Sequence, residues 1–294
     1  MTAASHIQPL ERLIPLPARG GAMAALEMGP GDRPVDIVFS HANGFNGRTY
    51  RSILQPLAAD LRILAVDLRG HGASTLPAAI EGRAGWMAFR DDLLALLEAV
   101  ADGPVVLAGH SMGGTTSLLA AAADPGRVRA LALFDPVIFP AEAQGPSAPE
   151  SPLVAGALRR RATFPSKSAA YEAYLGRGAF KTWAPDQLAD YVAAGFRETE
   201  AGDVTLTCTP AWEASNFRTH NYDPWAAFHT SRCPIRVLRA EVASTFRLDE
   251  REAGLDADRI AIETVPGTSH FLPMERPDLV RATLTATAEL RAKA

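Results

Sequence analysis

The sequence is poor in cysteine, in basic charge and in long apolar runs, and each shortage excludes a class of protein. Its two cysteines, Cys208 and Cys233, form no metal-spaced pair and indicate inert thiols in a reducing compartment. The 29 lysines and arginines are outnumbered by 33 acidic residues, so the chain lacks the basic excess of a nucleic-acid-binding protein. No stretch approaches the ~20 apolar residues of a membrane span.

Local features of the chain support the same exclusions. Residues 1–17 lack the basic start and apolar core of a signal peptide, so we expect a cytoplasmic protein without membrane or nucleic-acid partners. The one dense basic run, residues 159–161, is typical of a solvated helix face. No tail, coiled coil or peptide-binding signature indicates a scaffold, and nothing in the sequence indicates an oligomeric state. A small molecule is the expected partner.

Short apolar runs alternate with helical patterns along most of the chain. This alternation is typical of an α/β fold with a mostly parallel central sheet and flanking crossover helices. We predict buried strands over residues 36–40, 61–66, 104–108, 130–134, 235–240 and 260–265. Residues 10–28 are expected to add one or two antiparallel edge strands. The predicted helices span residues 86–100, 112–123 and 277–291.

The alternation breaks between residues 137 and 232. This region opens with a loop rich in proline, alanine and glycine over residues 140–152, and it holds three of the four tryptophans. Several helices are expected to follow, carrying Tyr171, Tyr174, Trp183, Tyr191 and Phe196. We therefore predict an α/β core over residues 1–136 and 233–294, with a helical cap inserted over residues 137–232.

The strongest chemical signal is the sequence GHSMG over residues 109–113, which matches G-x-S-x-G. A predicted strand runs directly into it and a predicted helix leaves it, as a nucleophile elbow requires. Such a turn holds Ser111 in a strained conformation with its hydroxyl exposed above the sheet. The first N–H groups of the helix lack partners, so the Met112 N–H is a candidate oxyanion donor.

A serine hydroxyl needs a base to take its proton, and His270 is the best candidate. It follows the last predicted strand in a turn that contains Pro266 and Gly267, and it precedes the last helix. Loops that follow parallel strands lie at the same edge of the sheet, where the elbow is also expected. We therefore predict that His270 is the general base of Ser111.

The loop HANGF, residues 41–45, also follows a predicted strand. We expect the main-chain N–H of Asn43 to complete the oxyanion hole, and His41 to order the loop. The candidate substrate-binding residues are Phe45, His41, Trp183 and Trp212. Aromatic side chains among them would make the pocket partly apolar.

Together these stretches resemble the α/β-hydrolase superfamily, in the branch with a His-Gly type oxyanion loop and a helical cap. The matching segments are HANGF (41–45), DLRGHGAS (67–74), GHSMGG (109–114), FDP (134–136) and PGTSHFLPMERP (266–277). The resemblance implies a serine–acid–histidine triad in that chain order, with no metal and no cofactor.

The acid of the triad departs from the common family pattern. Many members carry it after the strand that follows the cap, and here that position falls on Ala243. Two carboxylates are available instead. Asp135 ends the strand before the cap, and Glu241 ends the strand after it. We favour Asp135, because some family members place the acid there.

These features predict a serine hydrolase that acts on a small apolar carboxylic ester, or on a related acyl substrate, through an acyl-enzyme. The same residues are compatible with a carbon–carbon bond hydrolase, a lactonase, a thioesterase, an acyltransferase or a cofactor-free haloperoxidase. A small-molecule receptor without turnover is the alternative from another class, since fold alone does not determine function.

Overall fold

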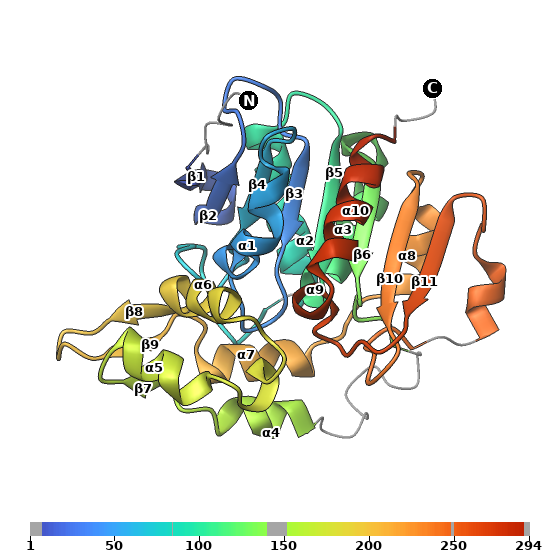
Figure 1. Cartoon of the computed structure of the whole chain (residues 1–294). Helices are drawn as coiled ribbons and strands as arrows, with labels where there is room; N and C mark the ends of the chain where they lie inside the picture. The colour runs from blue at the N-terminus through green and yellow to red at the C-terminus, as the bar shows by residue number, and fades with distance from the viewer. Residues whose placement is uncertain (1–7, 84, 140–151, 248–249, 291–294) are drawn as a thin grey trace, which may run out of the picture.

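The computed structural model describes residues 8–83, 85–139, 152–247 and 250–290, and a twisted sheet runs through its centre (Figure 1). The strand order is β1-β2-β4-β3-β5-β6-β10-β11. These strands span Leu10–Leu16, Gly21–Met28, Ile63–Val66, Ile37–Ser40, Val105–His110, Val128–Phe134, Ile235–Ala240 and Ile260–Val265, in that order. Strand β2 pairs antiparallel with β1 and β4, and the remaining neighbours are parallel. The predicted fold class is therefore confirmed.

The central strands are mostly apolar and are buried along their whole length, because helices cover both faces of the sheet. Every residue of β3, β4 and β5 is buried. Parallel strands buried on two faces are expected to be continuous hydrophobic runs, and this is why the sequence pattern located them. All six parallel strands end at the same edge of the sheet, so the loops that follow them lie close together.

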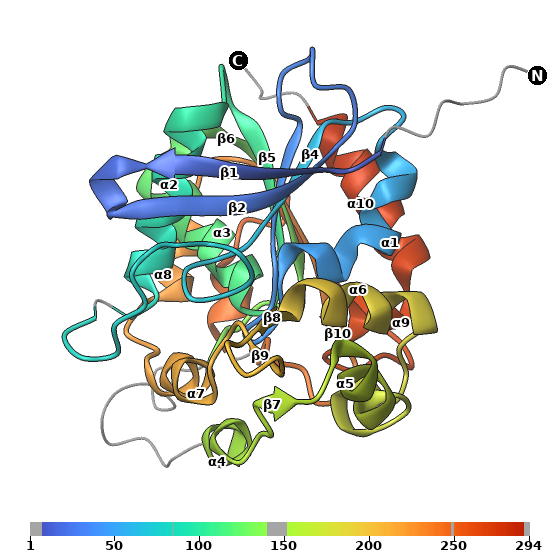
Figure 2. The same cartoon turned by 90° about the vertical axis from the view of Figure 1, so that its left-hand side faces the viewer.

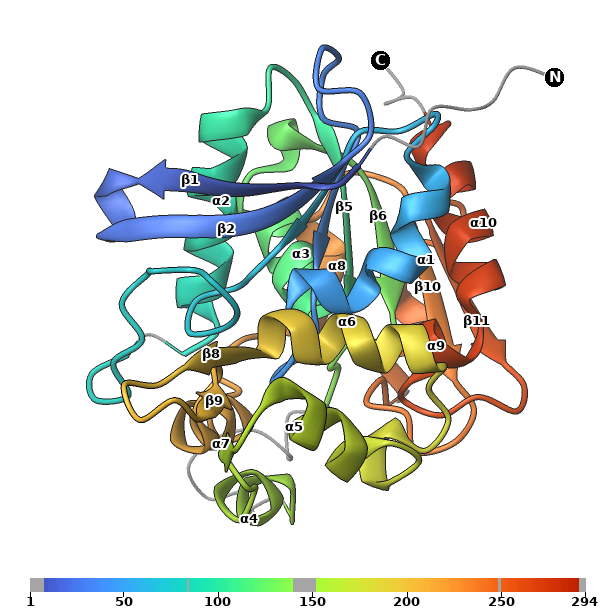
Figure 3. The ribbon, with the colours of Figure 1, turned by 60° about the vertical axis from the view of Figure 1, so that its left-hand side comes forward.

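Two layers of helices pack on the sheet (Figures 2 and 3). Helices α2 (Met87–Val100), α3 (Met112–Ala123) and α8 (Pro224–Thr230) cover one face. Helices α1 (Arg51–Leu54) and α10 (Pro277–Ala288) cover the other. Helix α8 was predicted within the inserted cap, yet it lies beside α3, with Trp225 and Phe228 in the same apolar cluster as Leu118.

The rest of the insertion lies across the carboxyl ends of the strands (Figure 1). Its helices are α4 (Pro152–Leu158), α5 (Lys167–Tyr174), α6 (Pro185–Gly195) and α7 (Pro210–Arg218). A small antiparallel sheet joins them, in the order β7 (Thr163–Phe164), β9 (Val204–Leu206) and β8 (Phe196–Glu198). This sheet was not predicted, because strands of two or three residues are too short to show alternation.

The insertion differs from the sequence prediction in two further details. Trp183 lies in a turn before α6, and Phe196 begins β8, so the prediction that both lie on helices was wrong. The proline- and alanine-rich loop predicted over residues 140–152 lies outside the described residues, except for Pro152, which begins α4. Among the helices described, none has the length and hydropathy required to cross a membrane.

Candidate active site

Ser111 occupies a sharp turn between β5 and α3. Its φ of 54° and ψ of −120° place a residue with a side chain in a conformation that is costly outside glycine. Flanking glycines make the turn possible. A Cβ on Gly109 would lie 2.5 Å from the carbonyl carbon of Gly113, and one on Gly113 would lie 2.1 Å from the carbonyl oxygen of Ser40. The sequence therefore forms the strand–turn–helix that the motif requires.

The side chains of Ser111, His270 and Asp135 form a continuous chain of hydrogen bonds. Nε2 of His270 lies 3.0 Å from Oγ of Ser111, and Nδ1 of His270 lies 2.6 Å from Oδ2 of Asp135. Asp135 is fully buried. A carboxylate at Nδ1 holds the proton on that nitrogen, so Nε2 is left as the acceptor for the serine hydroxyl.

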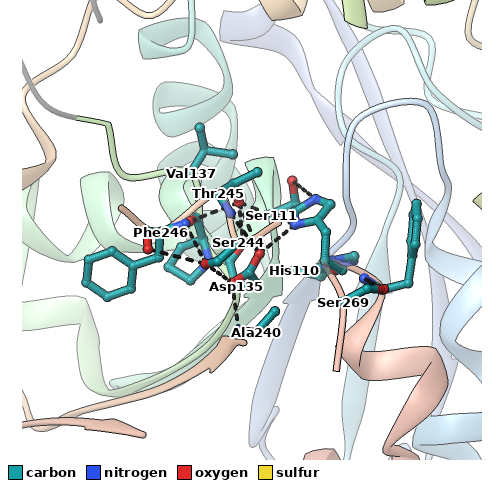
Figure 4. A network of polar contacts seen from close by, with 12 residues as sticks. His110, Ser111, Asp135, Val137, Ala240, Ser244, Thr245, Phe246 and Ser269 are labelled. Carbon is teal, nitrogen blue, oxygen red and sulfur yellow. Dashed lines mark hydrogen bonds and ion pairs between the residues drawn. The ribbon is translucent and has the colours of Figure 1, made fainter. Parts of the chain in front are cut away.

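The loop after β10 surrounds the carboxylate of Asp135 with donors (Figure 4). Oδ1 accepts from the Ala240 N–H at 2.9 Å and from the Ser244 hydroxyl at 2.5 Å, while Oδ2 accepts from the Thr245 N–H at 3.0 Å. Burial by itself raises the pKa of Asp135, but the hydrogen bond and charge of His270, with the donors of Ser244 and Ala240, outweigh it and lower this pKa. Asp135 is thus held as a carboxylate.

The residues that follow Asp135 are tied to this same loop. Ile138 forms a parallel bridge with Phe246, and its N–H donates to the carbonyl of Thr245 at 3.0 Å. The Arg247 N–H in turn donates to the carbonyl of Ile138 at 2.9 Å. The start of the insertion and the loop after β10 therefore form one braced unit.

The alternative acid, Glu241, lies elsewhere. Its side chain is exposed and accepts from the Gly267 N–H at 2.9 Å. Ala243, where the common family pattern expects the acid, has a φ of 52° in the turn that carries Ser244 and Thr245. In this chain the loop after β10 supplies hydrogen-bond donors to Asp135, which follows β6.

The loop of residues 41–45 is fixed by its polar side chains. The Asn43 side chain donates to the carbonyl of Glu213 at 3.0 Å and accepts from the Asn216 side chain at 2.8 Å, both on α7. His41 is fully buried, and its Nε2 accepts from the Leu68 N–H at 2.9 Å. Because the side chain of Asn43 forms its hydrogen bonds with α7, the main-chain N–H of Asn43 is the group that can donate to a substrate oxygen.

Ser111 and His270 open onto a cavity of about 900 Å³ between the sheet and the insertion. Asn43 and Met112, the candidate oxyanion donors, line the same cavity, as does Phe45. Among the described residues, the other candidate substrate-binding side chains lie outside this lining. His41 is buried in its loop, Trp183 packs edge-on to Phe45 at 5.1 Å, and Trp212 donates to the carbonyl of Arg69 at 3.1 Å.

Sequence reasoning missed most of the cavity wall. Its aromatic lining, besides Phe45, comprises Trp86, Phe139, Phe180, Phe217 and Phe271. Its charged lining comprises Arg160, Glu213, Arg218 and Arg247. Arg160 is only partly exposed and donates to Oε2 of Glu213 at 2.9 Å, so the interpretation of its basic run as a solvated helix face was wrong for this residue. The sequence of three adjacent arginines does not indicate which side chain faces the cavity.

The chain is similar to known hydrolases in sequence. A model of the alpha/beta hydrolase family matches residues 37–283. Over 257 residues the chain is 26% identical to 2-(acetamidomethylene)succinate hydrolase of Mesorhizobium japonicum, covering 85% of this chain and 86% of that protein. It is also 34% identical over 125 residues to an esterase of Mycobacterium tuberculosis, covering 41% of this chain and 40% of the esterase.

Solved structures agree with the sequence matches. The crystal structure of E-2-(acetamidomethylene)succinate hydrolase superposes with a TM-score of 0.76 at 23% identity, covering 96% of this chain and 99% of that chain. A thioesterase domain from the curacin biosynthetic pathway superposes with a TM-score of 0.73 at 16% identity, covering 94% and 99%. These two likenesses concern the fold alone. Because the family model extends from β3 into α10, well over half of the sequence, this chain is a member of the alpha/beta hydrolase family.

Proposed function

We propose that this hydrolase acts on a small carboxylic ester or related acyl substrate through an acyl-enzyme, with Ser111 as nucleophile, His270 as general base and Asp135 as the acid. The observation that carries the proposal is the unbroken hydrogen-bond chain from Oγ of Ser111 to the buried carboxylate, at the wall of a cavity large enough for a small molecule.

Each step follows from this geometry. Oγ of Ser111 attacks the substrate carbonyl while Nε2 of His270 takes its proton, and Asp135 stabilises the resulting imidazolium. The main-chain N–H groups of Asn43 and Met112 stabilise the oxyanion of the tetrahedral intermediate. His270 then protonates the leaving group as the acyl bond breaks. Water, deprotonated by His270, releases the acid and restores Ser111.

The apolar part of the wall supports an apolar acyl or alcohol group. Phe45, Phe180 and Phe271 line the same cavity as Ser111 and His270, and Phe271 directly follows His270 in the chain. Burial of a substrate methylene against such side chains contributes about 0.8 kcal/mol. Short-chain aliphatic esters are therefore the first substrates to test.

A second substrate class is favoured by the charged part of the wall. Three arginines line the cavity, and Glu213 is the acidic residue among the described lining residues. Arg160 is paired with Glu213, whereas the Arg247 guanidinium lies 5.4 Å from the ring centre of Phe139, at the cavity wall. Arginine suits carboxylate recognition, and the Mesorhizobium relative is named for a succinate derivative. We propose an acyl substrate that carries a carboxylate as the second candidate.

One comparison tests the function and separates these classes. Hydrolysis of p-nitrophenyl butyrate and of the p-nitrophenyl monoester of succinate is measured for wild type, Ser111→Ala and Arg247→Met. Ser111→Ala should lower kcat for both by up to about 10⁶. An anionic site predicts that Arg247→Met raises KM for the succinate ester only. An active Ser111→Ala protein contradicts the mechanism. Saturable binding of an ester without turnover and without organophosphonate labelling of Ser111 would indicate a receptor.

A further inference from the structure

A line of buried polar groups connects the three loops that form the candidate active site. The Ala42 N–H, in the loop after β3, donates to the Tyr50 hydroxyl at 3.2 Å. That hydroxyl lies 2.8 Å from Nδ1 of His110, the last residue of β5 and the neighbour of Ser111. Nε2 of His110 lies 2.7 Å from the carbonyl oxygen of His270. Tyr50 and His110 are both fully buried.

The direction of every hydrogen bond in this line follows from its two ends. The carbonyl of His270 can only accept, so Nε2 of His110 donates to it, and in a neutral imidazole Nδ1 is then left as an acceptor. The Tyr50 hydroxyl therefore donates its hydrogen to Nδ1. At the other end the Ala42 N–H can only donate, and the Tyr50 oxygen accepts from it. One tautomer of His110 satisfies all four groups.

The charge state of both side chains agrees with this assignment. Burial, with a contribution from the neighbouring His270, lowers the pKa of His110 to about 3, so the imidazole is neutral over the working range of most enzymes. Burial also raises the pKa of the Tyr50 hydroxyl above its ordinary value, which keeps the donor proton in place. The line therefore has a single protonation pattern near neutral pH.

We propose that Tyr50 and His110 are positioning residues that hold the loop of residues 41–45 and the backbone of His270 in register with Ser111. The inference rests on the proposed function, since it concerns the alignment of base and oxyanion donors. Neither Tyr50 nor His110 is among the residues that line the cavity. They act on the reaction only through the groups that they hold, so their loss should lower kcat with little change in KM.

Tyr50→Phe is the sharpest test, because it removes one oxygen and leaves the Ala42 N–H and Nδ1 of His110 without their partner. A displacement of reacting groups by about 1 Å can cost up to about 10²-fold in rate, so we expect kcat to fall at least tenfold. His110→Gln retains an N–H that can reach the His270 carbonyl, and it should lose less activity than His110→Leu. The matched control is Tyr174→Phe, at a half-buried tyrosine whose buried hydroxyl has no hydrogen-bond partner among the described residues.

The kinetic experiment measures kcat and KM for p-nitrophenyl butyrate in wild type and these four variants, with thermal unfolding to verify that each is folded. Wild-type turnover that Ser111→Ala abolishes supports the proposed function by itself. Given that turnover, a Tyr50→Phe protein within twofold of wild-type kcat overturns the positioning role. A fall in kcat that Tyr174→Phe reproduces overturns it equally, because it would reflect a general effect of the substitution.

A second readout is independent of turnover. ¹⁵N NMR of the histidine side chains, assigned with His110→Gln, should show His110 as the neutral Nε2–H tautomer between pH 5 and 8. Tyr50→Phe should shift the His110 and His270 resonances, and Tyr174→Phe should leave them in place. An Nδ1–H tautomer in the wild type would overturn the inference even if the protein hydrolyses none of the esters tested.

Discussion

Asn216 donates its side-chain amide to Oδ1 of Asn43 at 2.8 Å, and this bond joins helix α7 of the insertion to the loop that follows β3. Both side chains are buried. The carbonyl of Glu213 on the same helix accepts from the other end of the Asn43 amide at 3.0 Å. The insertion thereby determines the path of the backbone that we propose as an oxyanion donor.

Asn216→Ala is therefore expected to lower kcat. The substitution leaves Oδ1 of Asn43 buried without its donor, at a cost of about 1–3 kcal/mol that the loop can avoid by moving. Steady-state kinetics with p-nitrophenyl butyrate would measure the effect, for which we expect a loss of about tenfold or more. Thr219→Ala is the matched control, since Thr219 directly follows α7 and its hydroxyl donates to the carbonyl of Ser215 on that helix. Equal activity of the two variants would contradict the role of the Asn43–Asn216 bond.

The two candidate acids give opposite predictions on amidation. Asp135→Asn keeps the size of the side chain but presents an amide to Nδ1 of His270, so kcat should fall by about 10⁴. Glu241→Gln should retain wild-type kcat, because the Glu241 carboxylate is exposed and contacts the Gly267 N–H. Ester hydrolysis by the two variants is measured in parallel. Loss of kcat in Glu241→Gln, together with an active Asp135→Asn, would assign the acid to Glu241 instead of Asp135.

The Ser244 hydroxyl is expected to matter through the carboxylate it contacts. Its hydrogen bond is among the causes that lower the pKa of Asp135, so Ser244→Ala should raise that pKa and loosen the orientation of His270. Loss of one hydrogen bond to a charged group costs about 1.5–3 kcal/mol, which corresponds to roughly a ten- to hundredfold loss if it is fully expressed in kcat. Kinetics of Ser244→Ala and the conservative Ser244→Thr would test this, with partial recovery expected in the threonine variant.

Acid should destabilise the folded protein through its buried histidines. Burial lowers the pKa of His71 and of His220 to about 4, from 6.5 in the unfolded chain. Between these values the unfolded chain binds more protons, so the free energy of unfolding decreases as the pH is lowered, by up to about 1.4 kcal/mol per pH unit for each histidine. Asp67, whose pKa burial raises to about 6, acts in the opposite sense and offsets part of this slope.

Urea unfolding between pH 4.5 and 7.5 would measure this slope. His220→Phe is the informative variant, because His220 packs among the rings of Trp86, Phe139 and Tyr222, where an apolar ring is acceptable. It should reduce the slope near pH 5 by about one proton. An unchanged slope would show that His220 is protonated equally in the folded and unfolded states.

The sheet was predictable from sequence because its signals are local. Strands buried on two faces are uninterrupted apolar runs, and the elbow at Ser111 is a contiguous motif, so both could be located without any long-range information. Bounds of the predicted parallel strands differ from the observed ones by at most two residues, as in Ile63–Val66 against residues 61–66.

The remainder depended on contacts between distant parts of the chain. Asp135 and Glu241 both end strands at the same edge of the sheet, and only the direction of each side chain distinguishes them. The hydrogen bond between Tyr50 and His110 joins residues that are 60 positions apart, and no sequence motif predicts it. The cap aromatics could be recognised as buried, but whether a ring faces the cavity, as Phe180 does, or packs behind it, as Trp183 does, depends on the packing of the whole insertion.

The brace between Ile138 and Phe246 has a mechanical consequence. Asp135 lies only three positions before Ile138, so movement of the inserted helices would pull on the backbone of the proposed catalytic acid if nothing intervened. The bridge and the hydrogen bonds on either side of it anchor Ile138 to the loop after β10, and the inserted helices come later in the chain. These contacts hold the backbone beside Asp135, and with it the contact between Asp135 and His270, against displacements that would be transmitted from the inserted helices.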